Sequence, residues 1–253
     1  MQIAEGIGNS TYHAFQFSVE RRVATGLTFT SNYTWGKSMD VVSQNANGTL
    51  SGPFNVVSDP NNINLFRGRS DYDLSHSLAS SFIWQFPSYA NRSNQFLKRV
   101  VGGWQVSGIW MWQVGMPFTV YSGISNSLMG GGPDHADFVA GVSPSLDPNR
   151  SHAELVDHYF NTAAFQPNAL GTYGNSGRNI LRGPGFNNLD MGIMKVFPLR
   201  QEKYQVTFRG DFFNVTNSAH FMALQTSIAS PRPGSLNGAR DPRILQFALK
   251  FNW

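Results

Sequence analysis

The chain has 253 residues and a formal net charge of +4, with 13% charged and 13% aromatic residues and no cysteine. So many aromatic residues at so low a net charge exclude a disordered chain, and the lack of cysteine excludes disulfides and thiolate sites. No apolar run reaches the roughly 18 residues of a membrane-spanning helix, and the scattered basic residues argue against nucleic-acid binding.

Apolar and polar residues alternate in seven segments of about ten residues, which predicts seven β-strands. Soluble strands cluster near 5 to 6 residues, whereas a tilted strand that crosses a bilayer needs roughly ten. The fifth segment, 189–197, is less regular because Lys195 falls among its apolar positions. The apolar positions of the other six are Phe15, Phe17, Val19; Leu27, Phe29, Tyr33, Trp35; Leu78, Phe82, Trp84, Phe86; Trp104, Val106, Trp110, Trp112, Val114; Tyr204, Val206, Phe208, Phe212; and Leu245, Phe247, Leu249, Phe251, Trp253.

The connections between these strands alternate between short and long. The short ones are 22–26, 87–102 and 199–203, and the long ones are 36–74, 115–188 and 214–243. Short turns on one side and long loops on the other are typical of outer-membrane barrels, whose turns are periplasmic. We therefore expect an all-β, antiparallel transmembrane barrel segment of about seven or eight long strands, with its C-terminus on the periplasmic side.

The polar positions of the strands carry mainly Ser, Thr, Gln, Asn and Gly rather than the Lys and Glu of a solvent-exposed face. This chemistry favours a barrel lumen over the outer face of a soluble β-sandwich. A few charges of both signs share these positions, and we expect them to pair inside the lumen. They are Glu20, Asp190, Arg209, Asp211 and Lys250.

The segment that follows strand four, Gly115 to Tyr121, is interpreted as a bulge and a continuation of that strand beyond the membrane. Counting it as a separate crossing would reverse the alternation of turns and loops. Seven crossings are an odd number, whereas complete single-chain bacterial barrels have an even number. Either one strand lies in a segment interpreted as loop, for example near 173–181, or the chain is part of a larger barrel.

Several motifs resemble a known family when they are taken in order. They are Tyr12–Gln16 with Glu20–Arg22, Asn32–Ser38, Gly103–Gly108, Arg182–Gly185 with Asn188–Asp190, and Phe212–Asn217. Over nearly the whole chain they resemble the C-terminal barrel of TonB-dependent outer-membrane receptors, and more narrowly the Oar-like group with its carboxypeptidase-regulatory-like domain. The resemblance implies that residues 1–253 are the C-terminal part of such a barrel, in the bacterial outer membrane.

The last segment resembles the signal that the barrel-assembly machinery reads, in which alternating apolar residues end in an aromatic residue. These residues are Leu245, Phe247, Leu249, Phe251 and Trp253. An edge strand with one fully apolar face is what a strand-pairing machine is able to grip. The expected partners are therefore outer-membrane lipid, this machinery, and the family's plug and N-terminal strands, with TonB contacted through the plug.

Two further clusters contain residue types found in metal sites or in hydrolase active sites. Asp134, His135 and Asp137 offer three metal ligands, but no fourth ligand lies at a recognisable spacing. Asp71, Asp73 and His76 beside Ser75 and Ser77 contain the parts of a hydrolase, but no nucleophile-elbow motif accompanies them. We expect no catalytic residue, no metal and no cofactor.

Two alternative functions stay open from the sequence. One is a self-contained outer-membrane barrel or adhesin. The other is a soluble all-β carbohydrate-binding or hydrolase module, whose loop aromatics Tyr159, Phe160, Phe165 and Tyr173 would stack on sugars. The start, Met1–Gly6, lacks the pattern of an export signal, so we expect any such signal to lie upstream.

Overall fold

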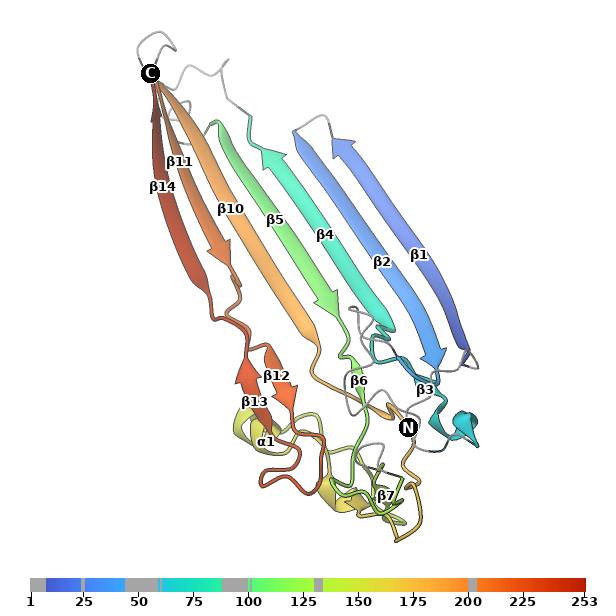
Figure 1. The fold of residues 1–253 in the computed structure, drawn as a ribbon. Helices are drawn as coiled ribbons and strands as arrows, with labels where there is room; N and C mark the ends of the chain where they lie inside the picture. Colours follow the sequence, from blue (N-terminus) through green and yellow to red (C-terminus); the bar gives the residue numbers. More distant parts are fainter. Residues whose placement is uncertain are drawn as a thin grey trace.

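The computed structural model describes residues 8–23, 26–43, 59, 61–87, 100, 102–129, 134–199 and 204–253. Its main element is one curved antiparallel sheet, and the order of its long strands is β1-β2-β4-β5-β10-β11-β14 (Figure 1). The bounds are β1 Ser10–Val23, β2 Leu27–Asp40, β4 His76–Gln85, β5 Trp104–Gln113, β10 Phe186–Leu199, β11 Tyr204–Phe213 and β14 Ile244–Asn252. The seven predicted strands and their antiparallel order are confirmed.

The strand ends that flank the short connections lie at one end of the sheet and those that flank the long ones at the other, here named the turn end and the loop end (Figure 1). The last strand finishes at the turn end, because Asn252 pairs with Gln205 at the start of β11. Residues 24–25, 88–99, 101 and 200–203 of the predicted turns lie outside the described residues. Three strands extend further toward the loop end than predicted: β1 begins at Ser10, β2 ends at Asp40 and β10 begins at Phe186.

The strand register carries the two-sided pattern of the sequence across the whole sheet. One row of partners joins Phe29, Phe82, Gly108, Met191 and Phe212. The neighbouring row joins Glu20, Thr30, Ser81, Ile109 and Asp190. Because paired residues point to the same side of a sheet, one side is bulky and apolar and the other small and polar. We call these sides the apolar face and the polar face.

The second and third long connections fold together into a second unit beyond the loop end, which we name the loop cap (described residues 115–129, 134–185 and 214–243). Within the described residues it contains three strand pairs, one short helix and one 3₁₀ turn (Figure 1). The elements are β6 Pro117–Phe118 with β9 Leu181–Arg182, β7 Asp137–Phe138 with β8 Phe165–Gln166, β12 Phe221–Leu224 with β13 Leu236–Ala239, α1 His152–Asp157 and η3 Thr162–Ala164. The first long connection adds η1 Ile63–Phe66 and β3 Gly68–Arg69, which pairs with β2.

The predicted continuation of strand four is confirmed in the β6–β9 pair, which prolongs the β5–β10 pair into the loop cap. Gly115 allows the bend between them, because a Cβ at this position would lie only 1.7 Å from the carbonyl oxygen of Gly183. The suggested eighth strand at 173–181 is wrong. Only Leu181 and its neighbour Arg182 are in a strand there; residues 173–180 are not in a strand, and Arg178 and Asn179 bond to the first long connection.

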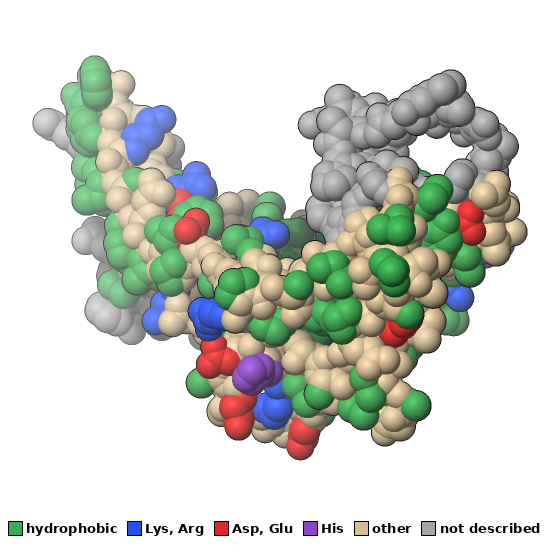
Figure 2. Space-filling model, turned by 60° about the horizontal axis from the view of Figure 1, so that its bottom comes forward, with side chains coloured by type: hydrophobic (Ala, Val, Ile, Leu, Met, Phe, Trp, Pro, Cys, Tyr) green, Lys and Arg blue, Asp and Glu red, His purple; other side chains and the backbone are tan. Residues whose placement is uncertain are grey.

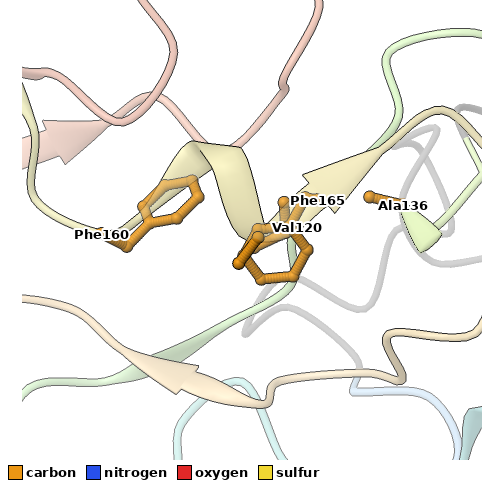
Figure 3. Close-up of a cluster of buried hydrophobic side chains, with 5 residues drawn as sticks. Val120, Ala136, Phe160 and Phe165 are labelled. Carbon is orange, nitrogen blue, oxygen red and sulfur yellow. The ribbon is translucent and has the colours of Figure 1, made fainter. Parts of the chain in front are cut away.

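The loop cap has its own small core, built from Val120, Ala136, Phe160, Ala164 and Phe165 (Figure 3). Phe160 and Phe165 meet edge to face at 5.8 Å between ring centroids. Leu224 and Ile228, from the third long connection, pack against this cluster. The cap is therefore a packed structure on top of the sheet rather than a set of separate loops.

Candidate functional site

Six charged side chains join the loop cap to the loop ends of β2, β3 and β4. This loop ion-pair network contains three acids and three arginines, so its formal charges balance. Its members are Asp40, Arg69, Asp71, Asp73, Arg178 and Arg182. The network is the most densely bonded polar cluster of the described residues and the candidate for organising the loop side. Figure 2, turned to bring the loop end forward, shows the outer surface on this side of the molecule, where acidic and basic side chains lie among apolar and neutral polar ones.

Asp73 is the best-connected acid of the network and is 2% exposed. Its Oδ2 accepts hydrogen bonds from Arg69 at 2.9 Å and Arg182 at 2.6 Å, and its Oδ1 accepts one from the Ser38 amide at 2.7 Å. Burial alone raises the pKa of Asp73, but the Ser38 amide and the two guanidinium groups outweigh it and hold this pKa below the ordinary 3.8. Asp73 therefore stays ionised as a structural anchor.

Arg178 ties the second long connection to the first. It is ion-paired with Asp40 and with Asp71, the latter at 2.7 Å, and donates to the Ser43 hydroxyl at 2.8 Å. Its neighbour Asn179 donates to the Arg69 carbonyl and to Asp71, both at 2.6 Å. The Asn179 backbone is left-handed with a φ of 55°, a conformation that asparagine tolerates better than most residues. These bonds fix the loop cap against the sheet at one corner.

His135 and Tyr121 make the second junction between loops. The His135 ring packs edge-on against Phe66 at 5.4 Å and against Tyr121 at 5.9 Å. Tyr121 in turn bonds through its backbone to Thr226 and Ile228 of the third long connection. Burial, with a smaller contribution from the Arg178 charge, lowers the pKa of His135 to about 4, and burial raises the pKa of Tyr121. Both rings are therefore neutral at pH 7 and act as packing groups.

The buried neutral imidazole predicts that acid loosens the loop cap. In the unfolded cap His135 has its ordinary pKa of 6.5, so below that pH the unfolded state binds a proton that the folded state binds only near pH 4. Between pH 7 and pH 5 the cap should lose about 2 kcal/mol of stability from this group. Amide hydrogen exchange of residues 117–138 at the two pH values measures the loss. His135→Gln should remove most of the pH dependence, and an unchanged dependence in this variant would contradict the assignment.

The loop aromatics considered for sugar stacking are partly committed to packing. Phe160 and Phe165 lie in the core of the loop cap at 3% and 6% exposure, so neither exposes a full ring face on which a sugar would stack. Tyr159 and Tyr173 are half-buried. An open, largely apolar cleft of about 380 Å³ lies beside this core, lined by Ser122, Ile124, Thr162, Ala163, Phe165, Pro167, Ile228, Ala229 and Pro233.

The three potential metal ligands form hydrogen bonds and packing contacts in the loop cap. The Asp134 carboxylate accepts from the Ser127 amide and hydroxyl and from Asn168, at 2.6 to 2.9 Å. Asp137 accepts from the Asn175 amide, and His135 packs in the aromatic junction. Residues 130–133, which precede this cluster, lie outside the described residues.

The residues weighed as hydrolase parts are separated. Asp73 and Ser75 both bond to Arg69 and Arg182 within the ion-pair network. The His76 ring stacks between Tyr33 and Trp35, and its Nδ1 is 2.7 Å from the Tyr33 hydroxyl. A catalytic serine needs a hydrogen bond to a histidine, which in turn needs one to a carboxylate. Among the described residues, no hydrogen bond links His76 to Ser75 or to Asp73.

The five charges predicted for the lumen all lie on the polar face, at register positions Glu20–Thr30, Asp190–Ile109, Arg209–Met194, Asp211–Gly192 and Lys250–Thr207. The structure brings two of them together, Arg209 and Asp211, at 2.8 Å. Asp190 instead accepts from the Asn214 amide and the Asn188 side chain, both near 2.9 Å, and so supports the turn after β11.

Aromatic side chains gather near both ends of the apolar face. Near the turn end, Trp84 meets Phe86 at 4.3 Å and Tyr204 stacks on Phe251 at 6.0 Å between ring centroids. Near the loop end, Tyr33 and Trp35 flank His76. Trp84 and His76 are eight residues apart, which is about 26 Å along a strand and about 20 Å of height at a usual tilt of about 40°. Two aromatic belts at this separation match the two interfaces of a bilayer.

Lys195 explains the irregularity of the fifth strand. It lies on the apolar face opposite Trp104 and Phe208, as its sequence position indicates. Its Nζ donates to the Val100 carbonyl at 2.8 Å and lies 5.1 Å from the ring centroids of Trp104 and Phe197. The aliphatic part of the Lys195 side chain thus covers apolar surface near the turn end. Its ammonium group reaches a backbone carbonyl, that of Val100.

Comparison with known proteins agrees with this two-sided sheet. The model of a family described as "Outer membrane beta barrel domain" matches residues 1–246. The chain belongs to this family, and it is a protein of the bacterial outer membrane. No curated protein and no solved structure matches it.

The outer-membrane location assigns the two faces. The apolar face with its aromatic belts contacts lipid, and the polar face lines the lumen. The alternative of a soluble carbohydrate-binding or hydrolase module is therefore wrong, because the chain belongs to an outer-membrane family and the large apolar side chains that such a module would bury are exposed on the sheet. Within the described part of the chain, no helix is both long and apolar enough to span a membrane.

Proposed function

We propose that the chain is the C-terminal part of the barrel of a TonB-dependent receptor of the Oar-like group, which takes up or binds a ligand through its loop side. The order and spacing of the motifs from Tyr12 to Asn217 support the family. The observation that carries the proposal is the direction of the two free edges of the sheet.

Both edge strands run from the loop end to the turn end. Ser10 of β1 pairs with Asp40 at the loop end, and Ile244 of β14 pairs with Phe213 there. If β1 and β14 met, they would therefore pair in parallel, whereas bacterial single-chain barrels are antiparallel and even-stranded. Within the described residues neither edge has a further partner. An open edge in lipid leaves backbone groups unpaired, so an odd number of additional strands is needed.

A second copy of this chain does not supply those strands. Two copies inserted in the same direction would place β14 of one beside β1 of the other, and both strands run toward the turn end. A segment encoded upstream with an odd number of strands does fit. Transporters with about 22 strands around a plugged lumen would leave on the order of fifteen for it.

The role proposed for these residues is binding and passage rather than catalysis. Asp73 and Ser75 accept hydrogen bonds from Arg182, and His76 stacks on two aromatic rings on the lipid-facing side. The parts that contact a ligand in this proposal are the loop cap and the polar face. TonB and the plug act through the upstream segment.

The proposal is tested on the complete product of the gene. Outer-membrane fractionation followed by gel electrophoresis of boiled and unboiled samples should give a heat-modifiable band much larger than 28.0 kDa. The purified product should also bind the periplasmic domain of TonB. A heat-modifiable band near 28.0 kDa would contradict the larger barrel, and a large barrel without TonB binding would contradict the receptor assignment.

The edge strand β14 predicts how the barrel is assembled. Every residue of β14 is exposed, and its lipid-facing positions, including Phe247 and Phe251, are apolar. Replacing Phe251 by Ser should reduce the amount of folded barrel in the membrane, because the machinery grips this strand through its apolar side. The same change on the polar side, Asn252→Ser, is the matched control. Equal yields of the two variants in a heat-modifiability assay would contradict a signal in these residues.

A further inference from the structure

Basic side chains gather on the lipid-facing side of β1 and β2, just beyond the aromatic belt at the loop end. The register pairs His13 with Lys37, and one step further down it pairs Phe15 with Trp35. All four residues are exposed. One step on the same face of a strand is about 7 Å, so at a tilt of about 40° the basic pair lies about 5 Å of height outside the aromatic belt.

Arg67 extends this group from the first long connection. Its guanidinium donates to the Asn9 side chain and, at 3.3 Å, to the Thr11 hydroxyl on the same face as His13. Both partners are neutral, so they hold the side chain without compensating its charge. Within the described part of the chain, neither Arg67 nor Lys37 forms an ion pair.

Among the described residues at the loop end of β1, β2 and β3, no acid lies on the lipid-facing side. The outward positions at the loop end of β1, β2 and β3 are Thr11, His13, Trp35, Lys37, Met39 and Arg69. Arg69 is compensated by Asp73, and the other network acids are paired with Arg178. A net positive charge therefore lies at this rim, at the height where lipid headgroups begin.

We propose that His13, Lys37 and Arg67 bind the phosphate groups of a membrane lipid in the leaflet at the loop end. Phe15 and Trp35 directly below offer apolar surface for the acyl chains of the same molecule, which favours a lipid over a soluble phosphate. Basic side chains next to an anionic leaflet attract its headgroups, and aromatic rings anchor at the same interface.

The test uses the complete gene product in a non-ionic detergent, with diphosphoryl lipid A as the probe and native mass spectrometry as the readout. Lys37→Ser with Arg67→Ser should weaken binding roughly 30-fold. The matched control is Arg21→Ser with Arg22→Ser, which removes the same charge from the opposite, turn end of β1 and should leave binding unchanged. The charge-preserving pair Lys37→Arg with Arg67→Lys should retain binding.

Heat-modifiability shows whether each variant is folded. If the double serine variant does not fold, Lys37→Ser alone serves, because Lys37 forms no ion pair in the described chain. Unchanged binding in a folded serine variant overturns the proposal, as does an equal loss in the Arg21 and Arg22 control. Displacement of the lipid by an equimolar amount of inorganic phosphate overturns the lipid as the occupant.

Discussion

An arginine in place of Ile193 should destabilise the folded barrel much more than an arginine in place of Ile109. Both are isoleucines in the middle of neighbouring strands. Ile193 is flanked by Val106 and Gly210 on the apolar face. Ile109 lies opposite Ser81 and Asp190 on the polar face.

The difference follows from what each side chain contacts. An arginine near the middle of the lipid-facing side costs about 2 to 4 kcal/mol, a large share of the stability of a membrane barrel. An arginine at position 109 enters the lumen next to the Asp190 carboxylate, which offers it a partner. The free energy of unfolding in urea with lipid vesicles, measured on the complete gene product, separates the two variants.

The pair of variants also tests the assignment of faces. If the polar side faced lipid, Ile109→Arg would be the damaging change and Ile193→Arg the mild one. Equal costs would indicate that neither position faces the bilayer centre, and the placement of the sheet in the membrane would then be wrong.

The strands and their faces could be predicted because alternation is a local property. Each strand places neighbouring residues on opposite sides, so the period of two identifies the face even at exceptions such as Ile109. What alternation does not give is the partner across the sheet. Ser31 and Ser80 both lie on the apolar face, and their hydroxyls satisfy each other at 2.7 Å. They are 49 residues apart in sequence, and only the register brings them together.

The contacts of the loop cap could not be predicted from the alternation of apolar and polar residues, because the segments that they join show no such alternation. Arg178 was not singled out from sequence, although it bonds to residues more than 100 positions away. The only local sign was the density of charge in the segment from Arg67 to Asp73. Such a run normally indicates a solvated loop, and nothing local distinguishes carboxylates that pair with distant arginines from those of a catalytic site.

Asp73→Asn should release the loop cap from the end of the sheet. The substitution keeps the shape of the side chain but removes the charge that Arg69 and Arg182 share. Two arginines would then face each other without their anion, which costs about 3 kcal/mol at a buried site of this kind. Amide hydrogen exchange around Ser38 and Arg182, in the complete gene product in detergent, should rise accordingly.

Asp71→Asn is the matched control. Asp71 is also paired with an arginine, at 2.7 Å from Arg178, but its side chain is 55% exposed. Exposed ion pairs contribute less than about 1 kcal/mol, so this variant should leave exchange in the cap nearly unchanged. Equal effects of the two substitutions would mean that burial of Asp73 does not decide its contribution.

Acid should reproduce the effect of Asp73→Asn in the unchanged protein. The pKa of Asp73 in the folded cap lies below 3.8, so its stabilising contribution is complete above that value and is lost as the pH falls through the folded pKa. His135 loses its contribution at higher pH, between 6.5 and about 4. The two steps are separable because His135→Gln removes only the first and Asp73→Asn only the second. If either variant removed both pH-dependent steps, the ion-pair network and the aromatic junction would unfold together as one cooperative unit.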